Sequence, residues 1–309
     1  MKQNINRRNF LQRTAALGGG ALLSQLPAVA AMPAAKAGFK LVVLATDWGF
    51  PGNRDALCKK AKEAGYDGIE VWWPGSAEAQ NEIFDAVEKY GMEVGFLASG
   101  GSNEFNAHAK SFEATLLAAT GNNRKKPLYV NCHSGRDYYS EEQNGKLIDI
   151  TTKVSKSSGV PIYHETHRAR MMFAAHICRR FIETKPDLRL TLDISHWCNV
   201  HESFLGDQAE TVALALQRVG HIHARIGHPE GPQVNDPRAP EWEHAVKAHF
   251  AWWDEVAKMK RAKGEVMTVL TEFGPADYMP TLPYTRQPLA DQWAINVHMK
   301  DLLKARYGA

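Results

Sequence analysis

The chain has 309 residues, of which 44% are hydrophobic, so it is long enough to bury one large α/β core or two small ones. The formal net charge is +3, but four positive charges and no acid lie in residues 1–30, which leaves about −1 for the remainder. A chain near neutrality argues against an extended basic surface for nucleic acid.

The first 30 residues resemble a twin-arginine export signal. An arginine pair followed by two bulky apolar residues lies at 6–11, and a Gly/Ala/Leu-rich segment follows at 14–26. Residues 28–30 read AVA, an A-x-A cleavage pattern. The apolar segment is too short and too rich in small residues to favour a membrane span. We therefore expect residues 1–30 to be cleaved and the mature protein to be periplasmic; the alternative is a basic tail.

The four cysteines do not form a recognisable motif. Cys58, Cys132, Cys178 and Cys198 are scattered, with no CxxC pair and no zinc-ribbon spacing. Their positions in predicted strands and helices favour buried free thiols over a disulfide. Cysteine usage therefore indicates nothing about function.

Beyond the signal, strand patterns alternate with helix patterns, without an internal repeat or a low-complexity linker. We predict strands at 40–45, 68–72, 93–98, 127–133, 160–166, 189–194, 221–226 and 266–272. We predict helices after them at 54–64, 77–90, 104–120, 141–157, 171–184, 208–219, 242–261 and 287–303. Eight such units in about 275 residues match the number and size of a TIM barrel. We predict that residues 31–309 form a single (β/α)8 barrel of class α/β.

A doubly wound open sheet is the alternative fold. It usually places a glycine-rich phosphate-binding turn after the first strand. Residues 45–49 read ATDWG and do not fit such a turn.

Ionisable residues stand at the ends of four consecutive predicted strands. These are Glu165, Asp193, His223 and Glu272, and strand parity places His167 on the same face as Glu165. Barrel active sites lie at the C-terminal ends of the strands, so these side chains should converge. Three converging carboxylates would repel one another without a cation, so the pattern predicts a divalent metal site. Oxygen ligation with one nitrogen suits Mn²⁺, Co²⁺, Mg²⁺ or Zn²⁺, among which the sequence does not choose.

Each of these residues alone has an ordinary structural explanation, since a strand-end acid often caps a helix or forms an ion pair. The occurrence on four successive strands favours the metal site. Further candidates are substrate-binding residues, namely Trp72, His133, His167, His196 and Arg225. We expect His196 on a loop, within reach of a substrate hydroxyl. Trp72 is equally compatible with sugar stacking and with a plain place at the rim, and His221 is expected to be a hydrogen-bonded core histidine.

Four segments resemble motifs of the xylose-isomerase-like barrel superfamily: YHETHR at 163–168, LDISH at 192–196, HIHAR at 221–225 and LTEFG at 270–274. Within it, the chain resembles the sugar phosphate isomerase/epimerase group, which includes ketose 3-epimerases, inosose dehydratases and hydroxypyruvate isomerases. The resemblance implies that the four strand-end residues bind the metal. It further implies that Glu165 and Glu272 exchange a substrate proton, while His196 and Arg225 contact substrate oxygens.

The expected function is a sugar isomerase or epimerase that transfers a proton next to a carbonyl through an enediolate. The export signal and a Pro/Gly-rich loop at 228–238, either a lid or a packing loop, depart from well-studied epimerases. An exported keto-glycoside lyase or hydrolase, or a sugar dehydratase, is the alternative, and a non-catalytic sugar-binding protein or a DNA endonuclease is more remote. The expected partner is a sugar or keto-sugar, without nucleic acid or a membrane span; homo-oligomerisation stays open.

Overall fold

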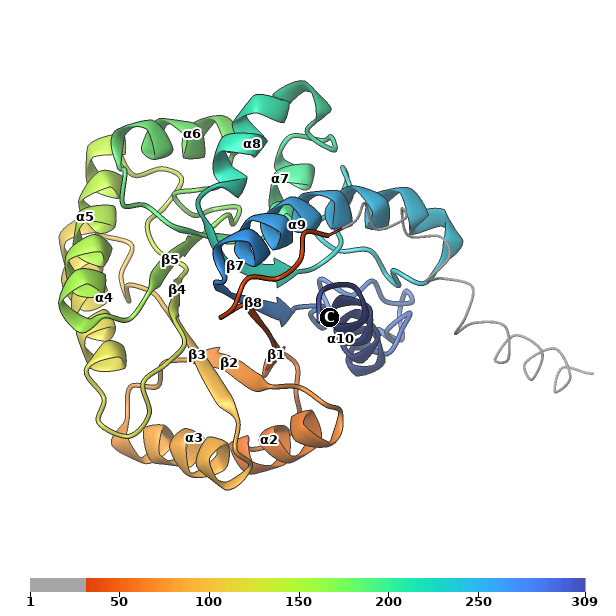
Figure 1. Cartoon of the computed structure of the whole chain (residues 1–309), viewed down its shortest axis with the longest axis horizontal. Helices are drawn as coiled ribbons and strands as arrows, with labels where there is room; N and C mark the ends of the chain where they lie inside the picture. Colours follow the sequence, from red (N-terminus) through yellow and green to blue (C-terminus); the bar gives the residue numbers. More distant parts are fainter. Residues whose placement is uncertain (1–31, 309) are drawn as a thin grey trace, which may run out of the picture.

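The computed structural model describes residues 32–308, so the predicted export signal lies outside the described residues. Eight parallel strands close into a barrel in chain order, with β8 pairing to β1. The helices form a ring around this barrel (Figure 1). The prediction of a single TIM barrel is confirmed, and the open-sheet alternative is excluded.

The strands are β1 (Lys40–Thr46), β2 (Gly68–Trp72), β3 (Glu93–Ala98), β4 (Val130–Cys132), β5 (Ile162–Glu165), β6 (Leu190–Leu192), β7 (Val219–Ala224) and β8 (Val266–Thr271). The main helices are α2 (Arg54–Glu63), α3 (Ala77–Lys89), α4 (Phe105–Thr120), α5 (Glu141–Ser158), α6 (Ala175–Thr184), α7 (Ile194–Val200), α8 (Ala209–Leu216), α9 (Glu243–Lys263) and α10 (Gln292–Tyr307). Two 3₁₀ turns, η1 (Gly206–Gln208) and η2 (Pro240–Trp242), precede α8 and α9.

Local signals set where the helices begin and end. Ser140 and Gln143 form a reciprocal capping box at the start of α5, and the Asp291 side chain caps α10. Gly264 ends α9 with φ 70°, and a Cβ there would lie 2.4 Å from the carbonyl oxygen of Ala37. Only glycine fits both the left-handed backbone and this close approach.

The structure differs from the sequence-based prediction in one place that matters for the site. We expected His196 on a loop, but it lies in α7, a short helix that the sequence pattern did not predict. Asp193 is the N-cap of this helix and accepts a hydrogen bond from the backbone N of Ser195 (3.1 Å). The loop assignment was wrong because a seven-residue helix is too short to show an amphipathic period.

The two faces of the barrel wall differ in polarity. Outward side chains such as Val43 and Ile69 pack with Leu57 and Phe84 of the surrounding helices. Inward side chains such as Val42, Leu44 and Leu270 are apolar, and ionisable side chains join them toward the C-terminal ends of the strands. All four cysteines are buried and free, as predicted. None of the helices in residues 32–308 is long and apolar enough to cross a membrane.

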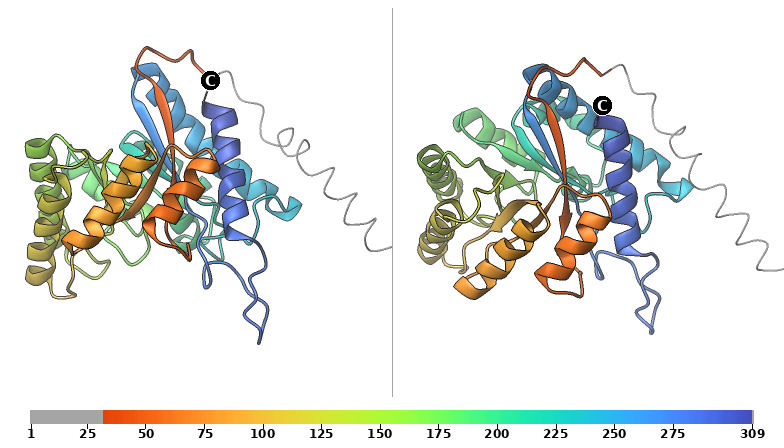
Figure 2. Two further views of the ribbon diagram at one scale, coloured as in Figure 1. Left: turned by 90° about the horizontal axis from the view of Figure 1, so that it is seen from below. Right: turned by 60° about the horizontal axis from the view of Figure 1, so that its bottom comes forward.

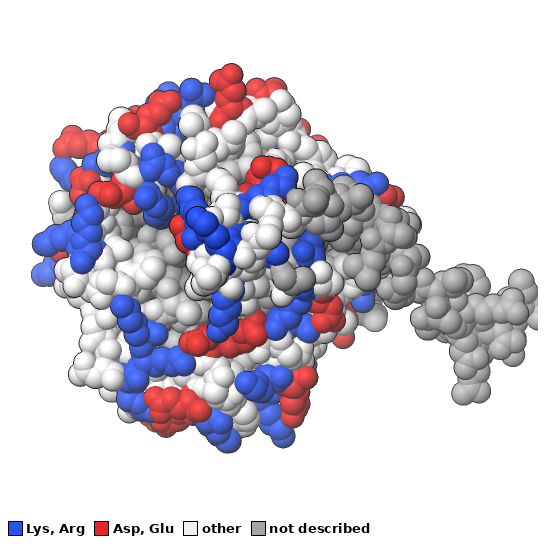
Figure 3. Space-filling view, in the orientation of Figure 1, with Lys and Arg blue, Asp and Glu red and all other residues white. Residues whose placement is uncertain are grey.

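The two ends of the barrel can be told apart in side view. The segment that joins β8 to α10 projects from the C-terminal end of the strands, at the lower edge of both views in Figure 2. The opposite end faces the viewer in Figure 3, where lysines and arginines are interspersed with acidic side chains.

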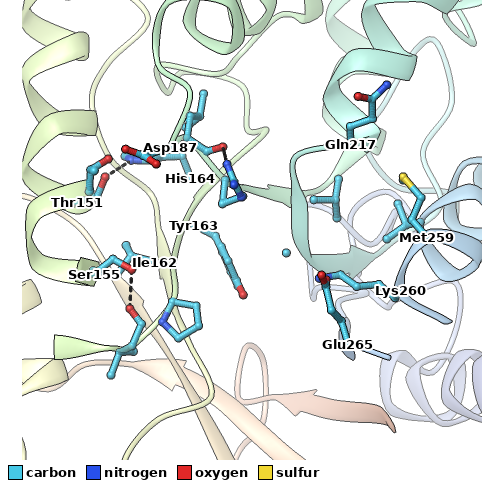
Figure 4. Close-up of a pocket in the computed structure, with 18 of the residues that line it drawn as sticks. Thr151, Ser155, Ile162, Tyr163, His164, Asp187, Gln217, Met259, Lys260 and Glu265 are labelled. Atoms are coloured by element: carbon cyan, nitrogen blue, oxygen red, sulfur yellow. Dashed lines mark hydrogen bonds and ion pairs between the residues drawn. The ribbon is translucent and has the colours of Figure 1, made fainter. Parts of the chain in front are cut away.

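A cavity of about 620 Å³ opens at the N-terminal end, beside the first residues of β5 and β7. Tyr163 points into it, opposite Lys260 and Glu265 (Figure 4). Gly220 makes room for this ring, because a Cβ there would lie 2.2 Å from a Tyr163 ring carbon. The cavity lies away from the predicted metal ligands, which stand at the other end of the same strands.

Candidate metal and active site

The four predicted metal ligands converge at the C-terminal end of the barrel. Glu165, Asp193, His223 and Glu272 each offer one ligand atom, and these four atoms lie within 4.8 Å of one another. All four residues are buried. Parallel strands of a closed barrel deliver their last inward side chains to one rim, which explains why residues distant in the chain meet.

His223 of β7 lies at the centre of this group. Its Nδ1 is 2.8 Å from Glu272 Oε2 and 3.7 Å from Glu165 Oε2, and its Nε2 is 3.0 Å from Glu70 Oε1. Burial favours the neutral ring, but the charges of Glu272, Glu70 and Glu165 raise the pKa of His223 well above its ordinary value. The surrounding carboxylates thus favour a positive charge at this position.

Glu165 keeps one oxygen without a protein partner. Its Oε2 accepts a hydrogen bond from Asn131 Nδ2 (2.7 Å) and lies 2.6 Å from His133 Nε2. Its Oε1 is buried and has no hydrogen-bond partner. Burial opposes ionisation, but His133 and His223 lower the pKa of Glu165 well below its ordinary value. A buried, ionised oxygen without a partner suits a metal ligand or a base.

Asp193 is held from two sides. Its Oδ1 accepts from Ser195, and its Oδ2 contacts Nη2 of Arg225. Burial, against the charge of Arg225, raises the pKa of Asp193 to about 7. The same Nη2 lies 3.6 Å from Glu272 Oε2, so Arg225 bridges two of the predicted ligands.

The other predicted substrate-binding residues form a row along the rim. The distances between successive ring centroids are 5.2 Å for Trp72 and His133, 4.8 Å for His133 and His167, and 3.9 Å for His167 and His196. Burial and nearby positive charge lower the pKa of His167 to about 3 and that of His196 well below its ordinary value, so both rings are neutral. Nε2 of His196 lies 2.8 Å from Arg225 Nη2, which leaves a buried Nδ1 without a partner. Trp72 is 44% exposed.

This donor set fits a divalent cation. Three carboxylates with one imidazole nitrogen match the ligands that Mg²⁺, Mn²⁺, Co²⁺ or Zn²⁺ take in proteins. The partnerless Oε1 of Glu165 is a buried acceptor that a cation would satisfy. Two further groups of possible metal ligands each share one residue with this four-residue set. One is His133, Glu165 and His167, and the other is Glu70, His221 and His223.

Glu70 is a site residue that the sequence reasoning missed. It reaches His223 across the barrel interior from β2, and its Oε2 accepts from the hydroxyl of Tyr129 (2.6 Å). His221 Nε2 lies 3.3 Å from the same oxygen, while His221 Nδ1 lies 3.0 Å from the carbonyl of Thr268. His221 is buried and hydrogen-bonded, as predicted. The signal for Glu70 was an acid in the otherwise apolar strand GIEVW.

Two aromatic residues at the rim were also missed. Tyr278 lies on the segment after β8, and the guanidinium carbons of Arg225 and Arg168 are 4.8 and 5.0 Å from its ring centroid. Trp48 meets Tyr278 edge-on at 4.8 Å. Neither residue lies in a periodic element, so strand and helix patterns carry no signal for them.

The loop at 228–238, for which we considered a lid, is packed against the barrel. The side-chain amide of Gln233 donates to the carbonyl of Gly274 (3.1 Å) and accepts from its backbone N (2.7 Å). Val234 is buried, and its N donates to the carbonyl of Ile226 (2.9 Å). These contacts favour the packing alternative and brace the backbone two residues after Glu272.

Solved structures share this fold at low sequence identity. The chain is similar to 3-keto-D-glucoside 4-epimerase, YcjR, from E. coli (16% identity, TM-score 0.57, covering 86% of this chain and 100% of that one). It is also similar to a xylose isomerase-like TIM barrel protein from Mycobacterium smegmatis in complex with magnesium (10% identity, TM-score 0.57, covering 86% of this chain and 96% of that one). A third similar structure is the IolI protein with a bound zinc atom (17% identity, TM-score 0.53, covering 87% of this chain and 99% of that one).

No curated protein sequence matches the chain. Residues 58–244, more than half of the chain, match a protein family described as xylose isomerase-like TIM barrel. The chain therefore belongs to the xylose isomerase-like TIM barrel family.

Proposed function

We propose that this protein is a divalent-metal-dependent sugar isomerase or epimerase that transfers a proton on a carbon next to a carbonyl. The observation that carries the proposal is the buried group at the C-terminal end. There, Glu165 at the end of β5 and Glu272 directly after β8 approach one nitrogen of His223, beside Asp193.

Glu165, Asp193, His223 and Glu272 would hold the metal. When bound, such a cation acts as a Lewis acid that polarises the carbonyl and an adjacent hydroxyl of the sugar. Similar structures hold magnesium or zinc, two of the four ions that we consider.

The protein side chains divide the proton transfer between them. Glu165 is ionised and has a partnerless oxygen, so it is suited to remove the proton and leave an enediolate. Glu272, which directly follows β8, supplies its own proton to the same carbon from the opposite face, which gives an epimer, and proton exchange with solvent then resets both glutamates. Return of the abstracted proton by Glu165 to the neighbouring carbon gives an isomer. Arg225 and Nδ1 of His196 are placed to hold substrate oxygens.

We propose a keto-sugar or a keto-glycoside as the first substrate class to test. The similarity to a 3-keto-D-glucoside 4-epimerase supports this choice at the level of the fold. The twin-arginine motif supports an exported, periplasmic enzyme. An N-terminus at residue 31 in protein recovered from the periplasm would test that part, and retention in the cytoplasm would contradict it.

Isotope exchange tests the chemistry. The metal-loaded protein is incubated in D₂O with keto-sugars and keto-glycosides, and the products are followed by NMR and mass spectrometry. Deuterium incorporated at a carbon next to the carbonyl, with a new epimer or isomer, supports the proposal. Release of the aglycone alcohol identifies the lyase alternative instead. If the wild type binds a sugar without deuterium exchange, and Glu165→Gln binds it equally well, the protein is a non-catalytic sugar-binding protein.

A further inference from the structure

Three arginines on the loops that follow β4 and β5 have no carboxylate within ion-pair distance in the part of the chain that the structure describes. Their hydrogen bonds go to neutral oxygens. Arg136 Nη2 donates to Asn103 Oδ1 (3.1 Å), and Arg168 Nη1 donates to Asn199 Oδ1 (3.4 Å). Arg170 Nη1 donates to the carbonyl of Ala169 (3.2 Å).

The three arginines are partly buried residues, and the hydrogen bonds of Arg136 and Arg170 named above lie at exposed positions. Within residues 32–308, the Nε atoms of Arg136 and Arg170 are buried and have no hydrogen-bond partner. Burial and the positive charge of Arg136 lower the pKa of Arg170, which shows that the two groups repel each other. Leaving partly desolvated cations without an anion is unfavourable, and such groups in a native structure call for a ligand as explanation.

The three arginines lie at the same end of the barrel as the metal ligands. Arg136 follows the rim residue His133 by three positions. Arg168 and Arg170 flank Ala169, whose φ of 60° is a left-handed conformation that an alanine rarely adopts. The guanidinium of Arg168 lies over the ring of Tyr278, and the guanidinium of Arg225, a residue of the site, contacts the same ring. The turn after Glu165 thus holds two cations at the mouth.

The charges inside the barrel do not neutralise these arginines. The buried carboxylates are Glu70, Glu165, Asp193 and Glu272. Even with all four ionised, a divalent metal and Arg225 leave only one excess negative charge. The three loop arginines and the exposed Asp137, whose charge also acts on Arg170, together add two positive charges and turn this into an excess of one positive charge toward the solvent side. An incoming anion is therefore attracted to the mouth of the metal-loaded site.

We propose that the substrate of this site carries an anionic group, a carboxylate or a phosphate, that binds to Arg168 and Arg170 with support from Arg136. The proposal rests on the proposed function in one respect: the carbonyl end of the sugar is placed at Glu165. Planar guanidinium groups match the oxygens of both anions and bind them with charge-assisted hydrogen bonds.

Calorimetric binding to the metal-loaded protein tests this with matched sugars. The probes are glucose and fructose, their 6-phosphates, and glucuronate, so the phosphate and carboxylate arms are measured separately. We expect at least one anionic probe to bind about tenfold or more tightly than its neutral counterpart, and added salt to reduce that preference. Arg168→Gln and Arg170→Gln should each lower the preference about tenfold without weakening the neutral sugar.

Two variants control the measurement. Arg168→Lys keeps the charge and should retain part of the preference, which a merely structural role would not predict. Arg189→Gln removes an arginine at the N-terminal end that bonds only to the carbonyls of Pro186 and Leu188, and it should change nothing. Anionic probes that bind no tighter than neutral ones, including failure of all to bind, would overturn the proposal. Glu165→Gln separates the two proposals, because it should abolish exchange and keep the preference for anions.

Discussion

The two ends of the barrel both carry ionisable side chains, but opposite charges are paired at the surface of one end and like charges are buried together at the other. At the N-terminal end, acids stand beside lysines on the surface, as in Lys156–Asp187 (2.7 Å) and Lys260–Glu265 (2.9 Å). At the C-terminal end, three carboxylates are buried together within 4.8 Å of a shared imidazole. Exposed pairs of opposite charge contribute little and are common on any surface.

Burial of like charges is the informative feature. It costs folding free energy, because desolvated carboxylates repel one another, and a fold keeps such a group where a function needs it. The size of a cavity does not carry this information, since the cavity of about 620 Å³ lies at the end without the buried acids. The two ends therefore make different predictions for variants placed on the same strand.

The largest expected difference is between the two ends of β5. Glu165→Gln removes the proposed base and one metal ligand, and we expect sugar-dependent proton exchange to fall about 10³-fold. Tyr163→Phe is the matched control on the same strand and face, at the other end. Its exchange rate should stay within about twofold of the wild type. Equal losses in both variants would mean that the C-terminal end has no special role.

Removal of metal should affect the C-terminal end alone. We expect a chelator to abolish exchange, and readdition of one equivalent of a divalent ion to restore it. Binding at about a hundredfold excess over Kd stabilises a fold by about 2.7 kcal/mol, which corresponds to a rise in Tm of about 4–5 °C for a chain of this length. Asp193→Asn should lose this shift in differential scanning calorimetry. A shift that persists in Asp193→Asn would place the metal elsewhere.

Glu70 lies between the two ends, and its contact with Nε2 of His223 should orient the opposite ring nitrogen toward the metal. We expect Glu70→Gln to weaken metal affinity about 10–100-fold, measured by competition with a chromophoric chelator. Tyr129→Phe removes only the hydrogen bond to Glu70 and should cost less. Unchanged affinity in Glu70→Gln would show that Glu70 serves the core and not the metal site.

A buried histidine outside the site should behave as an ordinary core group. His249 of α9 lies near the carbonyl of Ala245 (2.8 Å), and its Nε2 accepts from the backbone N of Gly227 (3.2 Å). Burial lowers the pKa of His249 to about 4, from an ordinary value of 6.5. Between these values the unfolded chain binds more protons, so stability is complete above pH 6.5 and is lost as the pH falls toward 4.

The variant His249→Gln keeps an acceptor and does not titrate. The advantage of the wild type in free energy of unfolding should therefore shrink by about 1.4 kcal/mol per pH unit below pH 6.5, as measured by urea denaturation. A difference that is constant with pH would contradict the assignment of a neutral, buried ring. This effect concerns stability only.

Much of the site follows from local sequence, because the rule for strand ends needs only the order of the elements. Glu165, Asp193, His223 and Glu272 were identified as converging residues once eight strand–helix units had been recognised. Parity along β5 likewise placed Tyr163 and Glu165 on the inner face. Their roles as metal ligands and proton-transfer groups stay predictions until the experiments above are done.

Other features needed the closed barrel. Glu70 meets His223 because barrel closure brings inward side chains of β2 and β7 into one interior, a contact that no periodic pattern predicts. His196 lies in a helix that Asp193 caps, and Tyr278 comes from an irregular segment. Arg136, Arg168 and Arg170 appear in the sequence as ordinary charges, and only their surroundings show that no carboxylate of residues 32–308 lies within ion-pair distance of them.

The sequence by itself determined the α/β class, the eight units and the residues at the strand ends, because periodicity and strand order are local properties. The tertiary structure decided which side chains share a charge environment: which acids are buried together, which histidines are neutral, and which arginines lack a counterion. Electrostatic energies depend on distance and burial in space, and separation along the chain sets neither of them.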